Sequence, residues 1–148
     1  MLADDVVVLL DGTDLTARVG LALELITVDG DGWPRVALLS AGEVLAAQDA
    51  VLRLALWPGS RTTANLERTA RAVLAFVHAG AAHRVGLRAR RDPDVLVAGE
   101  PRAVFDARVV SVRRDEVPYA RLRSGITFEL AEPDSVLARW HATLEAIR

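Results

Sequence analysis

The chain has 148 residues, with 18 basic and 20 acidic side chains and a formal net charge of −2. This length fits a single domain over residues 1–148, and a hydrophobic fraction of 51% excludes a disordered chain. The balanced charge and an aromatic fraction of 5% argue against binding to nucleic acid. Because the sequence has no cysteine, disulfides, thiol catalysis and thiolate metal sites are excluded.

The N-terminal residues also bear on location. Acidic side chains in Met1–Asp5 stand where a signal peptide carries basic ones. No apolar run approaches the roughly 20 residues that a membrane-spanning helix needs. We therefore expect a cytoplasmic protein that does not bind a membrane.

The first predicted elements are three strands. Residues Leu21–Val28 are apolar and β-prone, and they end in Asp29-Gly30-Asp31-Gly32, a strong turn signal. Residues Trp33–Ser40 then read as the returning strand of a hairpin. A third strand is predicted over Val51–Leu56, and Trp57-Pro58-Gly59 ends it.

A short helix and two further strands follow. Ser60 is a favourable N-cap for a helix that runs to about Arg71, because its hydroxyl can accept from a free first-turn amide. Residues Ala72–Val77 have the composition of a buried strand, and Ala82–Arg90 alternate between apolar and basic side chains. Residues 91–94 are expected to form a loop.

The last third of the chain is predicted to hold two strands and two helices. The strands cover Val104–Val112 and Ile126–Leu130, and a short helix runs from Asp115 to Leu122. A C-terminal amphipathic helix follows Pro133, with one apolar stripe formed by Val136, Leu137, Trp140, Leu144 and Ile147. Strands joined by tight turns predict a mainly β protein, an antiparallel barrel with attached helices.

The segment that carries chemical information begins where the third strand ends. Ser60, Arg61 and Thr62 open the predicted helix directly after a Pro-Gly turn. Free amides and the helix dipole favour an anion at this point, and hydroxyls and a guanidinium can bind phosphate oxygens. The segment is therefore a candidate phosphate site, with an ordinary capped helix and a solvated arginine as the alternative.

Three motifs, taken in order, resemble the pyridoxamine 5′-phosphate oxidase-like FMN-binding split barrels. The first is the hairpin over residues 29–40, with an acidic-Gly turn, an arginine and a strand ending Leu38-Leu39-Ser40. The second is Gly59-Ser60-Arg61-Thr62, where the family's oxidases often have Gly-Ser-Arg-Lys. The third is Leu74-Ala75-Phe76 followed by His83-Arg84-Val85, which is similar to a buried strand and an Arg-Gln-Val strand of the family.

The resemblance implies a split β-barrel of Greek-key type and a homodimer with FMN at the interface. By it, Arg35 and Arg61 hold the cofactor phosphate and Arg84 lies near the ring, reaching it from the second subunit. The full set of cofactor-binding residues that it implies is Arg35, Leu38, Leu39, Ser40, Leu56, Trp57, Ser60, Arg61, Thr62 and Arg84.

The sequence departs from the oxidases at two positions, because Ser40 and Thr62 replace family lysines. A C-terminal amphipathic helix also stands where the oxidases have a Trp- and Arg-rich segment. The prediction is thus an FMN-dependent oxidoreductase of unknown small-molecule substrate, not a true pyridoxamine phosphate oxidase. The alternatives are a non-catalytic flavin-binding or stress-related protein, with or without a cofactor, and a deazaflavin-dependent reductase.

The remaining polar residues suggest no further site. His78, His83 and His141 lack the spacing of metal ligands, so no metal site is predicted. No serine lies in a Gly-x-Ser-x-Gly motif, and no catalytic side chain is assigned. A basic series, Arg84, Arg88, Arg90 and Arg91, is either a basic patch or a solvated strand face, and we expect the latter.

Overall fold

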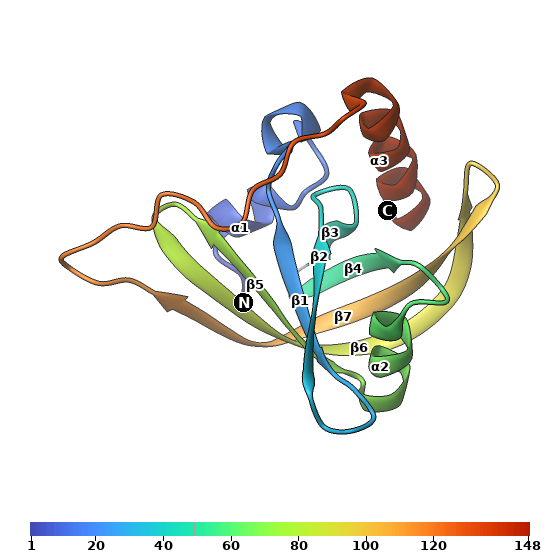
Figure 1. The fold of residues 1–148 in the computed structure, drawn as a ribbon, viewed down its shortest axis with the longest axis horizontal. Coiled ribbons are helices and arrows are strands. Elements are labelled where there is room, and N and C mark those ends of the chain that lie inside the picture. The colour runs from blue at the N-terminus through green and yellow to red at the C-terminus, as the bar shows by residue number, and fades with distance from the viewer. Residues whose placement is uncertain (49) are drawn as a thin grey trace.

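The computed structural model describes residues 1–48 and 50–148. Seven strands in this part of the chain form one antiparallel sheet in the order β2-β1-β5-β6-β7-β4-β3, strongly curled as in a barrel (Figure 1). The strands are β1 (Leu23–Val28), β2 (Pro34–Leu39), β3 (Val44–Gln48), β4 (Val51–Leu56), β5 (Arg71–His78), β6 (Ala81–Val97) and β7 (Glu100–Asp115). The helices are α1 (Asp4–Leu9), the short 3-10 helix η1 (Leu15–Arg18), α2 (Arg61–Thr69) and α3 (Pro133–Ile147). The predicted mainly β fold is confirmed.

The predicted β1–β2 hairpin is present, with Val28 opposite Pro34 at its closed end. In the turn, the Asp29 amide donates to the Trp33 carbonyl at 2.9 Å. Gly32 has a φ of +87°, a left-handed conformation that glycine adopts without steric cost. Side chains alternate along β1, so Leu23, Leu25 and Thr27 point into the barrel while the residues between them point outward.

Strands β6 and β7 are longer than the sequence predicted, with 17 and 16 residues. The expected loop over residues 91–94 is wrong, because this segment continues β6 through a register shift between Asp92 and Val95. Pro93 has no amide to give to a ladder, and a bulge is where a strand tolerates it. Because of this bulge, β6 continues past Pro93, a residue that ordinarily ends a strand.

Two other predicted elements are corrected. The helix over Asp115–Leu122 is wrong, since β7 runs to Asp115 and only an isolated bridge between Val117 and Ala120 follows. The strand over Ile126–Leu130 is reduced to one bridge between Thr127 and Leu21. Both segments lie in the irregular stretch before α3 (Figure 1). Strand β3 and helix α1 were not predicted.

The hydrophobic core has two parts. One fills the barrel and includes Leu25, Leu54, Leu74 and Phe105. The other lies under α3, where Trp140 is 6% exposed. The apolar stripe of the C-terminal helix therefore packs on its own chain. No helix in the described residues is long and apolar enough to span a membrane.

Candidate functional site

The beginning of α2 has the geometry expected of an anion site. The Ser60 hydroxyl caps the helix, accepting from the Thr63 amide at 3.1 Å. The Thr63 hydroxyl donates to the Trp57 carbonyl at 2.7 Å, which fixes the turn before the helix. The amides of Arg61 and Thr62 find no acceptor among the described residues. These first-turn amides and the exposed Arg61 side chain are therefore available to a phosphate.

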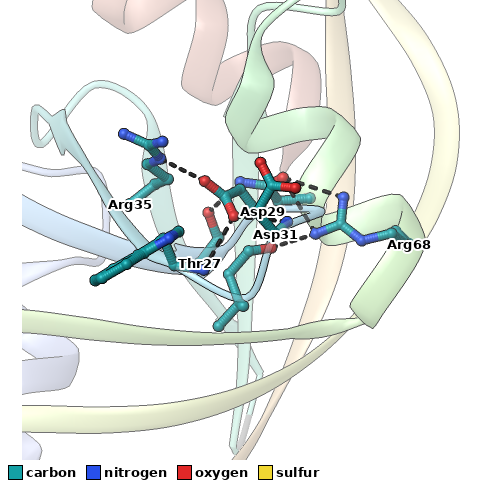
Figure 2. Close-up of polar contacts among 8 residues, drawn as sticks. Thr27, Asp29, Asp31, Arg35 and Arg68 are labelled. Atoms are coloured by element: carbon teal, nitrogen blue, oxygen red, sulfur yellow. Dashed lines mark hydrogen bonds and ion pairs between the residues drawn. The ribbon is translucent and has the colours of Figure 1, made fainter.

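Arg35 is held in place from one side. Its Nε donates to Asp29 Oδ2 at 2.7 Å, and neither terminal nitrogen has a partner in the described part of the chain (Figure 2). The Asp29 carboxylate also accepts from the amides of Asp31 and Trp33, at 2.9 and 3.0 Å. The Arg35 hydrogen bond is the main cause that lowers the pKa of Asp29. Asp29 thus orients a guanidinium whose two outer nitrogens remain available.

Polar contacts bring α2 to the strand next to Arg35. Asn65 Nδ2 donates to Thr27 Oγ1 at 3.0 Å, with both side chains buried. Arg68 donates to the Val28 carbonyl, and Thr27 is the cross-strand partner of Arg35 (Figure 2). Arg35 and α2 therefore lie at the same end of the barrel. Within residues 1–48 and 50–148, no hydrogen bond or ion pair joins Arg35 directly to residues 60–62.

Trp57 provides an aromatic surface four residues before Arg61. Its side chain is 53% exposed, and the Arg102 guanidinium lies over the ring, 3.8 Å from the centroid. Arg102 itself is only 5% exposed. A cation over the face of a tryptophan ring is attracted to it, so this contact stabilises the observed position of Trp57. Sequence reasoning selected Trp57 but missed Arg102, which lies more than 40 positions later in the chain.

The two leucines of the predicted ring site at the end of β2 differ in exposure. Leu38 is 57% exposed, whereas Leu39 is buried. Leu56 is also buried, so Leu39 and Leu56 can offer a ligand their backbone groups but little side-chain surface. β2 is an edge strand, so part of its backbone faces away from β1 and is not paired with another strand.

Ser40 takes part in a buried polar turn. Glu43 Oε2 accepts from the Ser40 amide at 2.6 Å and from its hydroxyl at 3.2 Å. The Ser40 hydroxyl also accepts from the Gly42 amide at 3.2 Å. Burial raises the pKa of Glu43, while the Ser40 hydrogen bonds and nearby Arg102 act in the opposite direction. Glu43 was missed by sequence reasoning because an isolated glutamate after a turn carries no motif.

Arg84 lies apart from the other predicted residues. It pairs with Asp115, and it stands in register with Ala75 on β5 and Arg113 on β7. No contact in the described residues joins Arg84 to α2 or to Arg35. Its predicted role requires a second subunit and stays a prediction.

The histidines belong to local packing. His83 is buried and stacks on Phe76 with ring centroids 5.1 Å apart, and its Nε2 lies 3.1 Å from the His78 carbonyl. Among residues 1–48 and 50–148, no cluster of three or more metal-ligating side chains is found.

Comparison with known proteins gives one relative along nearly the full length. No known family profile matches the chain. The uncharacterized protein YclD of Bacillus subtilis (strain 168) is 40% identical over 147 residues, which cover 99% of this chain and 96% of YclD.

Solved structures of lower identity share the fold. HupZ of Group A Streptococcus aligns with a TM-score of 0.60 at 17% identity, over 86% of this chain and 99% of HupZ. An FMN-binding protein from Syntrophomonas wolfei aligns with a TM-score of 0.50 at 16% identity, over 77% and 89% of the two chains. An F420 reductase aligns with a TM-score of 0.51 at 16% identity, over 65% and 91%. The predicted split-barrel fold, that of the pyridoxamine 5′-phosphate oxidase-like proteins, is confirmed.

Proposed function

We propose that this chain, which belongs to the same family as Bacillus subtilis YclD and has the split-barrel fold, binds FMN and serves as an oxidoreductase for a small molecule. Bound FMN would supply the hydride or electron transfer, and the protein would supply binding, orientation and electrostatics. This division agrees with a site that is built from arginines, hydroxyls and backbone amides.

The observation that carries the proposal is a free helix start with an exposed arginine, on a helix whose second half contacts β1 beside Arg35. Arg35 keeps two unpaired guanidinium nitrogens while Asp29 holds its third, and Arg61 begins α2 beside the free amides of the first turn. Phosphate accepts several charge-assisted hydrogen bonds, and arginine donates them in pairs. In our proposal Arg35, Ser60, Arg61 and Thr62 hold the FMN phosphate.

The ring of the cofactor would lie toward Trp57 and the end of β2. Trp57 offers half of its surface, and Arg102 behind it keeps the ring from turning away. The edge backbone at Leu38 and Leu39 provides donors and acceptors for the polar rim of a flavin. The Ser40 hydroxyl is already engaged by Glu43, so its part in the site is to shape this turn.

Assembly is the second part of the proposal. Val36 and Leu38 both point outward from β2 and are each 57% exposed, an apolar pair on an edge strand. We expect a homodimer that covers this pair, since two-fold pairing is the commonest soluble assembly. Arg84 would then approach the cofactor of the partner subunit. Sedimentation at tens of micromolar checks this, and a strict monomer with or without FMN contradicts it.

The binding proposal is tested by titrating FMN and following quenching of its fluorescence. Arg61→Ala should weaken binding by one to two decades in Kd, since a charge-assisted contact is worth about 1.5–3 kcal/mol. Arg123→Ala is the matched control, because Arg123 is exposed and makes no ion pair with a described residue. Equal affinities for the two variants would remove Arg61 from the site.

The same titration separates the rival functions. Uptake of FMN together with reduction by a nicotinamide donor supports the oxidoreductase. Tight binding of F420 in place of FMN indicates a deazaflavin reductase, whose phosphate could use the same helix start. A colourless protein that takes up neither cofactor contradicts the proposal and favours a non-catalytic protein.

A further inference from the structure

The aromatic side chain of the candidate site rests on a buried cation. Leu56 on β4 stands opposite Ala103 at the end of the β4–β7 ladder, so the antiparallel register brings the next residues, Trp57 and Arg102, to neighbouring positions. The Arg102 guanidinium lies 3.8 Å from the centroid of the Trp57 ring and covers one face of it. The exposed surface of Trp57 therefore belongs to the other face and the edges, which are available to a planar ligand.

Arg102 is anchored on its own strand. Its Nη1 donates to the Pro101 carbonyl at 3.1 Å, and its Nη2 lies 3.5 Å from Glu100 Oε2. Burying a guanidinium costs free energy unless its nitrogens find partners or its plane finds an aromatic face. Because Arg102 is fixed on the strand side, turning the Trp57 ring away would leave a buried charge with fewer contacts.

Glu43 joins this part of the site to its other wall, the end of β2. Its Oε2 accepts from the Ser40 amide at 2.6 Å, and its backbone carbonyl accepts from the Ala55 amide at 2.9 Å, two residues before Trp57. Burial raises the pKa of the Glu43 carboxyl, and the nearby charge of Arg102 is among the influences that oppose this shift. The last residues of β2 and of β4 are thus held together beside Arg102.

We infer that Arg102 is a positioning residue of the ligand site, one that presents the free face of Trp57 to a planar ring without touching the ligand itself. The inference rests on the proposed function, in which that ring belongs to FMN. A half-exposed tryptophan at a strand end otherwise samples several rotamers. Fixing the side chain before binding removes an ordering cost from the affinity.

A double-mutant cycle with Trp57, measured by FMN titration, tests this role. Arg102→Gln should weaken FMN binding about three- to tenfold, the size of a partly desolvated cation–π contact. In a Trp57→Leu background the same change should leave FMN affinity nearly unchanged, because Arg102 then has no ring to hold. Arg102→Lys keeps the charge but not the planar guanidinium, so its affinity should lie between those of the wild type and Arg102→Gln.

Arg53→Gln is the matched control. Arg53 is also a strand arginine with an acidic partner, since its Nε lies 3.1 Å from Asp106 Oδ1, and its Nη1 donates to the Ile147 carbonyl at 3.1 Å. Its loss should therefore lower stability at the end of α3 and leave FMN affinity unchanged. Melting temperatures establish that each variant is folded.

Acrylamide quenching of tryptophan fluorescence measures the ring itself, without a ligand. The chain has three tryptophans, and in a Trp33→Phe background Trp57 is the exposed one, because Trp140 is only 6% exposed. Acrylamide should quench this protein more strongly after Arg102→Gln, which uncovers the second face of Trp57. Arg53→Gln should leave the quenching as it is.

Three results would overturn the inference. Unchanged acrylamide quenching in Arg102→Gln would mean that the cation does not position the ring. An equal loss of FMN affinity with and without Trp57 would mean that Arg102 acts on the ligand by another route. The same loss in Arg53→Gln would trace the effect to general destabilisation. A wild type that takes up no FMN contradicts the cofactor proposal alone, and the quenching comparison then decides the role of Arg102.

Discussion

The two longer helices, α3 and α2, are attached to the barrel by different chemistry. Helix α3 buries Trp140, Leu144 and Ile147 in an apolar cluster of its own. Helix α2 is mostly polar: it buries one large apolar side chain, Leu66, in the barrel core and is joined to β1 by the buried Asn65–Thr27 hydrogen bond and by Arg68. Apolar burial is non-directional, whereas a buried hydrogen bond fixes position. The helix that carries the candidate phosphate site therefore has one apolar anchor, Leu66, and depends more than α3 does on directional contacts.

The largest expected effect is a loss of stability when Trp140 is removed from the apolar cluster beneath α3. Trp140→Ala should lower the free energy of unfolding by about 3–5 kcal/mol, because it leaves a cavity beneath α3. A Cβ on Gly42 would lie 2.1 Å from Trp140 Cγ, which shows how closely the ring approaches the backbone. Urea unfolding measures the loss, and Trp33→Ala is the control because Trp33 is 68% exposed. Similar losses in the two variants would mean that α3 contributes little to the core.

Removing the buried hydrogen bond that attaches α2 should lower the free energy of unfolding less than Trp140→Ala does, but it should also weaken FMN binding. Asn65→Ala leaves Thr27 buried without its partner, which should cost about 1–3 kcal/mol in unfolding free energy. Because α2 then loses its fixed position, FMN affinity should fall as well. A double-mutant cycle with Thr27→Ala isolates the hydrogen bond.

The sequence predicted the apolar part of this fold well, for a physical reason. Apolar β-prone segments and a turn signal located the hairpin, and hydrophobic periodicity located the C-terminal helix. Glu43 and Arg102 could not be found in this way, since their proximity depends on how distant strands are brought together. The predicted loop at residues 91–94 failed because Pro93 ends most strands but fits a bulge.

The candidate site was predicted in its composition but not in its geometry. Ser60 caps α2 as expected, and Arg61 is exposed at the helix start. The Asp29 contact that orients Arg35 depends on the folded turn, which the sequence indicated only as a turn. The alternation over Ala82–Arg90 left a basic patch and a solvated strand face open, and only pairing across strands shows that Arg88 lies opposite Arg71 and Arg108.

The smallest expected effect is a pH dependence from Glu43 near the α3 attachment. Burial raises the pKa of this carboxyl, so the folded state favours its protonated form. The resulting stabilisation is full below the pKa of the unfolded chain and is lost as the pH rises through the folded one. Glu43→Gln keeps an acceptor for the Ser40 amide but does not titrate. Urea unfolding between pH 4 and pH 8 should therefore show the wild type losing stability relative to this variant as the pH rises. Parallel profiles for the two proteins would mean that Arg102 and Arg139 compensate the buried charge, and that Glu43 remains ionised as a counterion for the cation behind Trp57.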